Sequence, residues 1–150
     1  MDPRTNNIGA YLEPEIANGE HTIVAGASLD GVKVTGETID RIDFNSLVLE
    51  TLWVTTLAIT QTFSITIGEQ QSDDDSDWDT ETVVQAVTVA ATGLVSAGAT
   101  YKGLIEDDIN LTAKKRYVRY NITPTLSASG TDTAAFLASV IKGGAVSKPA

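Results

Sequence analysis

The stretch Leu57-Ala58-Ile59-Thr60-Gln61-Thr62-Phe63-Ser64-Ile65-Thr66-Ile67 decides the fold class of this 150-residue chain. From Thr62 onward, apolar and hydroxyl side chains alternate with a period of two, which places them on opposite faces of a β-strand. The isoleucines and threonines are β-branched, and this favours the same conformation. Gln61 interrupts the apolar series, so the sequence predicts a bend at Thr60-Gln61 with a strand after it.

Further strands are expected on both sides of this stretch. Residues 47–54 are dense in Leu, Val and Trp and are predicted to form a buried strand. The other expected strands cover residues 21–34, with a turn at Asp30-Gly31, and residues 82–89, 106–111, 116–122 and 133–141. Pro124 is predicted to end the strand before it. The alanines of 133–141 are compatible with a helix, but the preceding turn and Val140-Ile141 favour a strand.

Short strands separated by turns, without a long amphipathic helix, predict an all-β protein. The expected fold is a single-domain antiparallel β-sandwich of jelly-roll type with an extended N-terminal arm. Residues 1–20 are assigned to the arm, 21–144 to the sandwich and 145–150 to a C-terminal tail. A chain of this length can bury a core that needs no disulfide or metal.

Composition narrows the function classes. The formal net charge is −10, and such a surface repels nucleic-acid phosphates and anionic membranes. The chain contains no Cys, which excludes disulfides, a thiolate nucleophile and zinc–sulfur sites. No apolar run approaches the roughly 18 residues of a membrane span, and no secretory signal is recognised. We therefore expect no cofactor, no nucleic-acid partner and no membrane partner.

An acidic segment between two expected strands has two interpretations. Its carboxylates alternate at Asp73, Asp75, Asp77 and Asp79, and clustered carboxylates can bind calcium. An EF-hand loop is excluded, because Trp78 stands where Gly is needed and Val84 where Glu is needed. The favoured interpretation is a solvated hairpin tip, with Trp78 folding back over the sandwich.

Catalytic patterns are sparse. His21 is the single histidine, and no nucleophile and carboxylate accompany it in the sequence. The pair Asp107-Asp108 is a poor candidate for a hydrolase, since neighbours in a strand point to opposite faces. We therefore expect a protein that is not an enzyme.

The basic cluster Lys114-Lys115-Arg116 and Arg119, interleaved with tyrosines, is compatible with a nucleic-acid strip. The net negative charge instead favours ion pairs between these arginines and the many acids.

Three motifs in order carry a resemblance. They are Gln70-Gln71-Ser72-Asp73-Asp74, then Lys115-Arg116-Tyr117-Val118-Arg119, then Gly130-Thr131-Asp132-Thr133-Ala134 leading to Gly143-Gly144. Over about residues 47–144 this order resembles small proteins of tailed bacteriophages that are encoded among the head genes. The shorter order of Ser72-Asp73-Asp74 with Trp78, followed by Lys115-Arg116-Tyr117-Val118-Arg119, is similar to discoidin-like, galactose-binding-like jelly rolls. Asp75 departs from the phage pattern, where Gly often closes the turn.

The phage resemblance implies a capsid decoration, or cement, protein. Such a protein binds the outer surface of the expanded head, with the major capsid protein as its partner, often as a homotrimer. It assembles in the host cytoplasm and ends on the capsid surface of the virion. Contacts are expected first on the arm, at Arg4, Asn6, Asn7, Ile8, Tyr11 and Leu12, because an extended arm can add a strand to a neighbour's edge.

The alternative is a carbohydrate-binding or adhesion module of a phage tail or surface structure. The discoidin-like pattern and four aromatic residues motivate it: Trp53, Trp78, Tyr101 and Tyr120. A glycan site needs aromatic rings that converge on one exposed face, so the positions of these four residues test the alternative.

Overall fold

The computed structural model describes residues 12–93, 99–127 and 130–145. These residues form eight strands and no helix: β1 (Glu13–Val24), β2 (Ile39–Asp40), β3 (Phe44–Leu57), β4 (Thr62–Ser72), β5 (Thr82–Thr92), β6 (Ala99–Asn110), β7 (Tyr117–Leu126) and β8 (Thr133–Ala145). Accordingly, the described residues include no helix long and apolar enough to cross a membrane.

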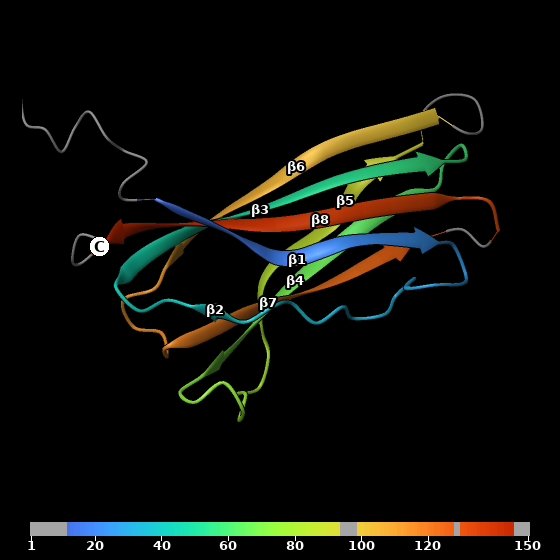
Figure 1. Ribbon diagram of the computed structural model, residues 1–150. Helices are drawn as coiled ribbons and strands as arrows, with labels where there is room; N and C mark the ends of the chain where they lie inside the picture. The colour runs from blue at the N-terminus through green and yellow to red at the C-terminus, as the bar shows by residue number, and fades with distance from the viewer. Residues whose placement is uncertain (1–11, 94–98, 128–129, 146–150) are drawn as a thin grey trace, which may run out of the picture.

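The strands form two four-stranded antiparallel sheets, ordered β1-β8-β3-β6 and β2-β7-β4-β5. In Figure 1, β6, β3, β8 and β1 follow one another across one layer, and β7, β4 and β5 run at an angle behind it. The pairs β1–β8, β2–β7, β3–β6 and β4–β5 are nested, as if one long antiparallel ribbon had been rolled up. This is the jelly-roll form of a β-sandwich, and it confirms the expected fold class.

The core lies between the sheets and follows from the alternation of side chains along each strand. Leu47, Leu49 and Leu57 of β3 face Phe63, Ile65 and Ile67 of β4, and all six side chains are buried. β7 and β8 complete the core with Val118, Tyr120, Ile122, Phe136, Ala138 and Val140. The expected bend at Thr60-Gln61 is the turn between β3 and β4, where Thr60 has a φ of 66°.

The expectation that Pro124 ends its strand is wrong, because β7 continues to Leu126. Pro124 pairs with Ile65 of β4, and its carbonyl accepts a hydrogen bond from the Gly31 N–H on the other side. The N and O atoms of one strand residue point the same way, so the Pro124 nitrogen faces away from β4. No ladder hydrogen bond to β4 is lost there, and the strand runs through the proline.

Two further boundaries differ from expectation. Residues 13–20, assigned to the arm, belong to β1, which pairs with β8 from Glu13↔Lys142 to Val24↔Thr133. The strand expected at 106–111 begins earlier and ends at Asn110, because Ala99 to Asn110 pairs continuously with β3. In both places the sequence of the edge strand alternates only weakly, and pairing with a strongly apolar neighbouring strand sets its bounds. By contrast, 133–141 is confirmed as a strand within β8.

Candidate interaction surface

The two outer faces of the sandwich differ in chemistry. On β7 and β4 of the β2-β7-β4-β5 sheet the outward side chains are polar and several bond to one another, whereas the edge strand β5 exposes Val83 and Val84, at 56% and 38%. The Arg119 guanidinium and the Asn121 amide both donate to Gln70 Oε1, at 2.9–3.0 Å. Asn121 also donates to the Glu81 carboxylate. This face therefore satisfies its own polar groups.

The outer face of the β1-β8-β3-β6 sheet is apolar at its centre. Leu52 of β3 lies directly between Leu137 of β8 and Leu104 of β6, and we call these three residues the leucine row. Leu52 is 47% exposed and Leu104 51% exposed. Ile16 and Val54 on the same face are similarly exposed. An alternating strand normally turns polar residues to solvent, so this face has the composition of a contact surface.

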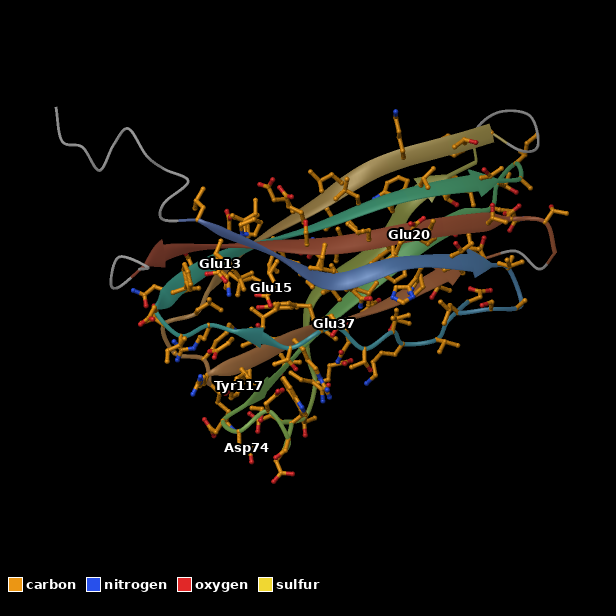
Figure 2. All side chains as sticks on the ribbon, viewed as in Figure 1. Glu13, Glu15, Glu20, Glu37, Asp74 and Tyr117 are labelled. Carbon is orange, nitrogen blue, oxygen red and sulfur yellow. The ribbon has the colours of Figure 1, made fainter. Side chains whose placement is uncertain are left out.

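A shallow depression of about 650 Å³ follows the leucine row. Its floor includes Trp53, Gly103 and Phe136, and its rim carries Glu20 and Lys102. Figure 2 places Glu20 over the β1–β8 part of this sheet. Trp53 is half-buried, and its ring centroid lies 5.9 Å from that of Phe63. Trp53 and Phe136 turn their side chains into the core, so the floor of the depression is the sheet itself.

Carboxylates flank the leucine row on one side. Glu50 of β3 lies directly opposite Glu106 of β6, and Asp108 follows two residues later on the same face. Like charges directly opposite in an antiparallel pair destabilise the sheet. None of these three carboxylates has an ion pair within the described residues. The charge next to the apolar centre is therefore negative and uncompensated.

A buried lysine fixes the edge strand β1 at one end of the same sheet. Lys142 of β8 points inward, its side chain is 5% exposed, and its Nζ lies 2.9 Å from Glu13 Oε1 and 3.0 Å from Glu15 Oε2. Figure 2 shows both glutamates along β1. Burial alone lowers the pKa of Lys142, but the bonds to the two glutamates outweigh burial and raise it. The Asp40 carbonyl accepts a further bond from Nζ, which ties β8 to β2.

The acidic segment forms the tip of the β4–β5 connection, away from Glu20 (Figure 2). Asp74 closes the tip: its Oδ1 accepts hydrogen bonds from the backbone N–H groups of Ser76 and Asp77 and from the Ser72 hydroxyl. These bonds lower the pKa of Asp74, the Asp77 N–H contributing most. Asp75, the next residue, has a φ of 63°, a backbone conformation that favours glycine.

The calcium candidates lie in this loop, where two of them share one lysine. Asp73 and Asp79 pair with Lys115 Nζ at 3.3 and 2.8 Å, and Asp75 accepts a hydrogen bond from the Thr38 hydroxyl at 2.7 Å. Asp77 is exposed. Over the described part of the chain, no three His, Asp or Glu side chains form a group suited to a metal ion.

The basic cluster binds side chains of this chain. Arg116 pairs with Asp40 at 2.7 Å. Burial raises the pKa of Asp40, but the hydrogen bond from Arg116 reverses this and lowers it. Arg119 differs from expectation: it bonds Gln70 and lies 4.0 Å over the ring of Trp78, which folds back onto β7 as predicted.

Lys114 enters the end of the core. Its Nζ lies 2.6 Å from Glu69 Oε1, and the Tyr120 hydroxyl donates to Glu69 Oε2 at 3.2 Å. Burial, reinforced by the charge of Glu69, raises the pKa of Tyr120. Glu69 is only 3% exposed, so the cluster is buried. Through its bonds to Lys114 and Tyr120, Glu69 joins β4, β7 and the segment before β7.

Most of the predicted arm contacts lie outside the described residues: Arg4, Asn6, Asn7, Ile8 and Tyr11. Leu12 is described, is 42% exposed, and lies close to Gly143, where an added Cβ would be 3.3 Å from Leu12 Cδ2. It also lines a second depression of about 800 Å³ with residues of β3, β6 and β8. Leu12 therefore extends the apolar surface beyond β1.

The four aromatic residues proposed for glycan binding do not share an exposed face. Tyr120 is fully buried, and Trp53 and Tyr101 are packed against the core. Trp78 lies under Arg119 on the other sheet. This arrangement counts against the carbohydrate-binding alternative.

The residues considered for catalysis are also dispersed. Asp107 pairs with the inward Leu49 and Asp108 with the outward Val48, so their carboxylates lie on opposite faces of β6. Burial, with a contribution from Asp108, raises the pKa of Asp107. The ring of His21 packs on Phe136, with the centroids 5.3 Å apart. His21 on β1 and the two aspartates on β6 lie on opposite edge strands of the sheet, so they do not form one group.

Solved structures of virus particles contain chains with a similar fold. The crystal structure of the infectious bursal disease virus VP2 subviral particle matches 92% of this chain, with 11% identity and a TM-score of 0.54. The structure of the Gx strain of that virus matches 91% of it, with 14% identity and a TM-score of 0.53. The chain spans about a third of the length of these proteins, 34% and 33%. These likenesses show a shared fold.

No protein-family model matches the chain, and no curated protein matches it. A xylan-binding module, CBM15, aligns over 91% of this chain and 98% of its own, at 14% identity, but its TM-score of 0.32 is too low to support an argument.

Sequence analysis missed the apolar outer face, although β3 carries its signal. Leu47 and Leu49 are buried in the core. The side chains that alternate with them face outward, and this outward series ends in the exposed Leu52 and Val54. A strand that is apolar on both faces is typical of one covered on both sides. The density of apolar residues in β3 indicates a buried strand, and the sequence alone does not show which of its two faces is covered by another part of the chain.

Proposed function

We propose that this chain is a non-enzymatic structural protein of a virion, and that it decorates the outer surface of a bacteriophage capsid and stabilises it. The observation that carries the proposal is the exposed apolar face on a jelly roll of the kind found in viral capsid proteins. The ordered motifs, which resemble those of phage head proteins, support the finer assignment to decoration. The major capsid protein is the proposed partner.

The structure gives these motifs a role in folding. Gln70 and Gln71 of the first motif bond Arg119 and the Lys115 backbone N–H of the second. The motifs therefore hold the β4–β5 hairpin against β7. A rigid module of this kind suits a protein that braces neighbouring capsid subunits, and many weak attachments on one shell raise the effective affinity.

Co-sedimentation with expanded capsids assembled without the protein tests this proposal. We expect saturable binding at a stoichiometry tied to the number of capsomers, and delayed rupture of the heads on heating. A parallel sample with a chelator tests whether the acidic loop needs calcium. Sedimentation velocity of the free protein tests the proposed homotrimer. Absence of binding to heads, with binding on a glycan array, would favour the carbohydrate-binding alternative.

A further inference from the structure

We propose that the outer face of the β1-β8-β3-β6 sheet docks onto a protein surface that has an apolar centre and a rim of Lys and Arg side chains. The inference rests on the proposed function, which makes that surface part of the capsid. The docking face consists of the leucine row with Ile16 and Val54, bordered by Glu20, Glu50, Glu106 and Asp108.

The first argument is the contrast between the central strands of the two sheets. Outward positions of β4 and β7 carry hydroxyl, amide and guanidinium groups that bond to one another, as Arg119 does to Gln70. Outward positions of β3 carry Leu52 and Val54, which are 47% and 42% exposed. Contiguous apolar area of this kind, bordered by polar residues, marks sites of protein contact. Within the described residues, no segment covers it.

The second argument is the sign of the charge. The described residues place four carboxylates around the docking face but one cation, Lys102, which lies on the opposite side of the leucine row from Glu106. The cross-strand neighbours Glu50 and Glu106 repel each other in the free protein. Lys or Arg side chains of a partner would relieve this repulsion. The charge therefore selects a basic partner.

A second copy of this chain fits the face less well. An isologous contact repeats the same residues on both sides. Two docking faces would together bring eight carboxylates and two lysines into one contact, since each contributes the four acids and Lys102. Most of the acids would remain unpaired, and like charges across an interface oppose association. A heterologous basic surface leaves no such excess.

Two double variants test the proposal on capsids that lack the protein. Leu52→Ala with Leu104→Ala removes apolar contact area and is expected to weaken binding about tenfold or more. Glu50→Gln with Glu106→Gln keeps the shape of both side chains. It is expected to weaken binding several-fold at low salt and to flatten the dependence of binding on salt.

The charge variant has a second readout. Because it removes a repulsive pair, it is expected to raise the thermal unfolding midpoint of the free protein while it weakens binding. A purely structural role of these glutamates would change the midpoint and leave binding unchanged. Glu37→Gln with Asp77→Asn is the matched control: both side chains are exposed, and the change in net charge is the same. This control is expected to bind capsids with the salt dependence of the wild type.

The outcomes separate the two proposals. Failure of the wild-type protein to bind capsids at any salt overturns the proposed function and the docking face with it. Wild-type binding that both face variants retain overturns the docking face alone. Self-association of the free wild-type protein that Leu52→Ala with Leu104→Ala abolishes would identify a second copy as the occupant and overturn the basic partner.

Discussion

Trp53 and Gly103 form a close contact between β3 and the edge strand β6. The two residues are directly paired, and both point inward. A Cβ atom on Gly103 would lie 2.5 Å from Trp53 Cζ2, closer than a Cβ atom approaches a non-bonded neighbour. The indole also packs on Phe63, at a centroid distance of 5.9 Å. Gly103 therefore provides the space that lets the largest side chain of β3 lie under β6.

We expect Gly103→Ala to destabilise the protein by about 1–3 kcal/mol, because the extra methyl group forces the indole or the edge strand to move. Urea unfolding followed by tryptophan fluorescence measures this change. Gly19→Ala is the control, since an added Cβ there meets nothing within 4 Å. Equal stability of the two variants would show that β6 accommodates the extra methyl group without strain.

Asp74 gives the acidic loop a dependence on pH. Its folded-state pKa is below the ordinary value of 3.8, since the carboxylate accepts bonds from the Asp77 and Ser76 N–H groups. A lowered pKa contributes stability that is present above the unfolded pKa and is lost as the pH falls through the folded pKa. The order of the loop should therefore persist below pH 3.8 and be lost in stronger acid.

Asp74→Asn is expected to remove this acid transition, because an amide oxygen still accepts hydrogen bonds but does not titrate. Hydrogen exchange of the loop amides from about pH 5 into stronger acid, as far as the sandwich itself stays folded, measures the effect after correction for the intrinsic rate. Asp77→Asn, on the same loop, is the control. An acid transition that persists in Asp74→Asn would assign it to another carboxylate.

At the scale of elements, the ion pairs of Lys142 hold β1 on β8. The side chain of Lys142 is 5% exposed, whereas those of Glu13 and Glu15 are 52% and 35% exposed. Removal of the two acids leaves a buried cation without a counter-charge, while removal of the lysine leaves acids that water can reach. The two changes should therefore differ in their effect on stability.

We expect Glu13→Gln with Glu15→Gln to destabilise the protein by about 1–3 kcal/mol, and more than Lys142→Met does. Chemical unfolding at pH 7 measures both variants, with Glu20→Gln on the same strand as the control. The raised pKa of Lys142 means that this stabilisation is present below about pH 10.5 and is lost as the pH rises through the folded-state pKa. A double variant as stable as wild type would contradict the role of the pair.

Element types were largely predictable, because burial in a sandwich imposes a period of two on the sequence. β4 was recognised by its alternation, β8 by the turn before it and by Val140-Ile141, and the bend at Thr60-Gln61 by the missing apolar residue. The end of β7 was not predicted correctly. Whether a proline ends a strand depends on which neighbouring strand its nitrogen faces, and that neighbour is distant in sequence. The N-terminal boundary failed for a related reason: the order of β1 comes from β8.

At the scale of the whole molecule, the sheet order and the docking face depend on the same long-range pairing. No local pattern brings Glu50 next to Glu106 or aligns Leu52 with Leu104 and Leu137; the pairing of β3 with β6 and β8 does so. Short motifs led instead to the β4–β5 hairpin and β7, where the conspicuous polar residues bond one another. The proposed interaction surface has no sequence motif. Binding through such a surface needs exposed apolar area and charge of one sign, and neither requires a fixed spacing of residues.

The nested ribbon also sets an expectation for folding. β1 pairs with β8 and β3 with both β6 and β8, so most strand pairs join segments that are far apart in the sequence. The entropy of closing such long loops is lost before the contacts form, and proteins of this topology refold in about a millisecond to a second.

In a Trp78→Phe variant the fluorescence reports Trp53 alone, since the chain has two tryptophans. We expect the stopped-flow refolding signal of Trp53 to fall in this range. A microsecond phase carrying the full Trp53 amplitude would mean that the β3–β6 region forms its core contacts without β8, and that the rolled ribbon does not limit the rate of folding.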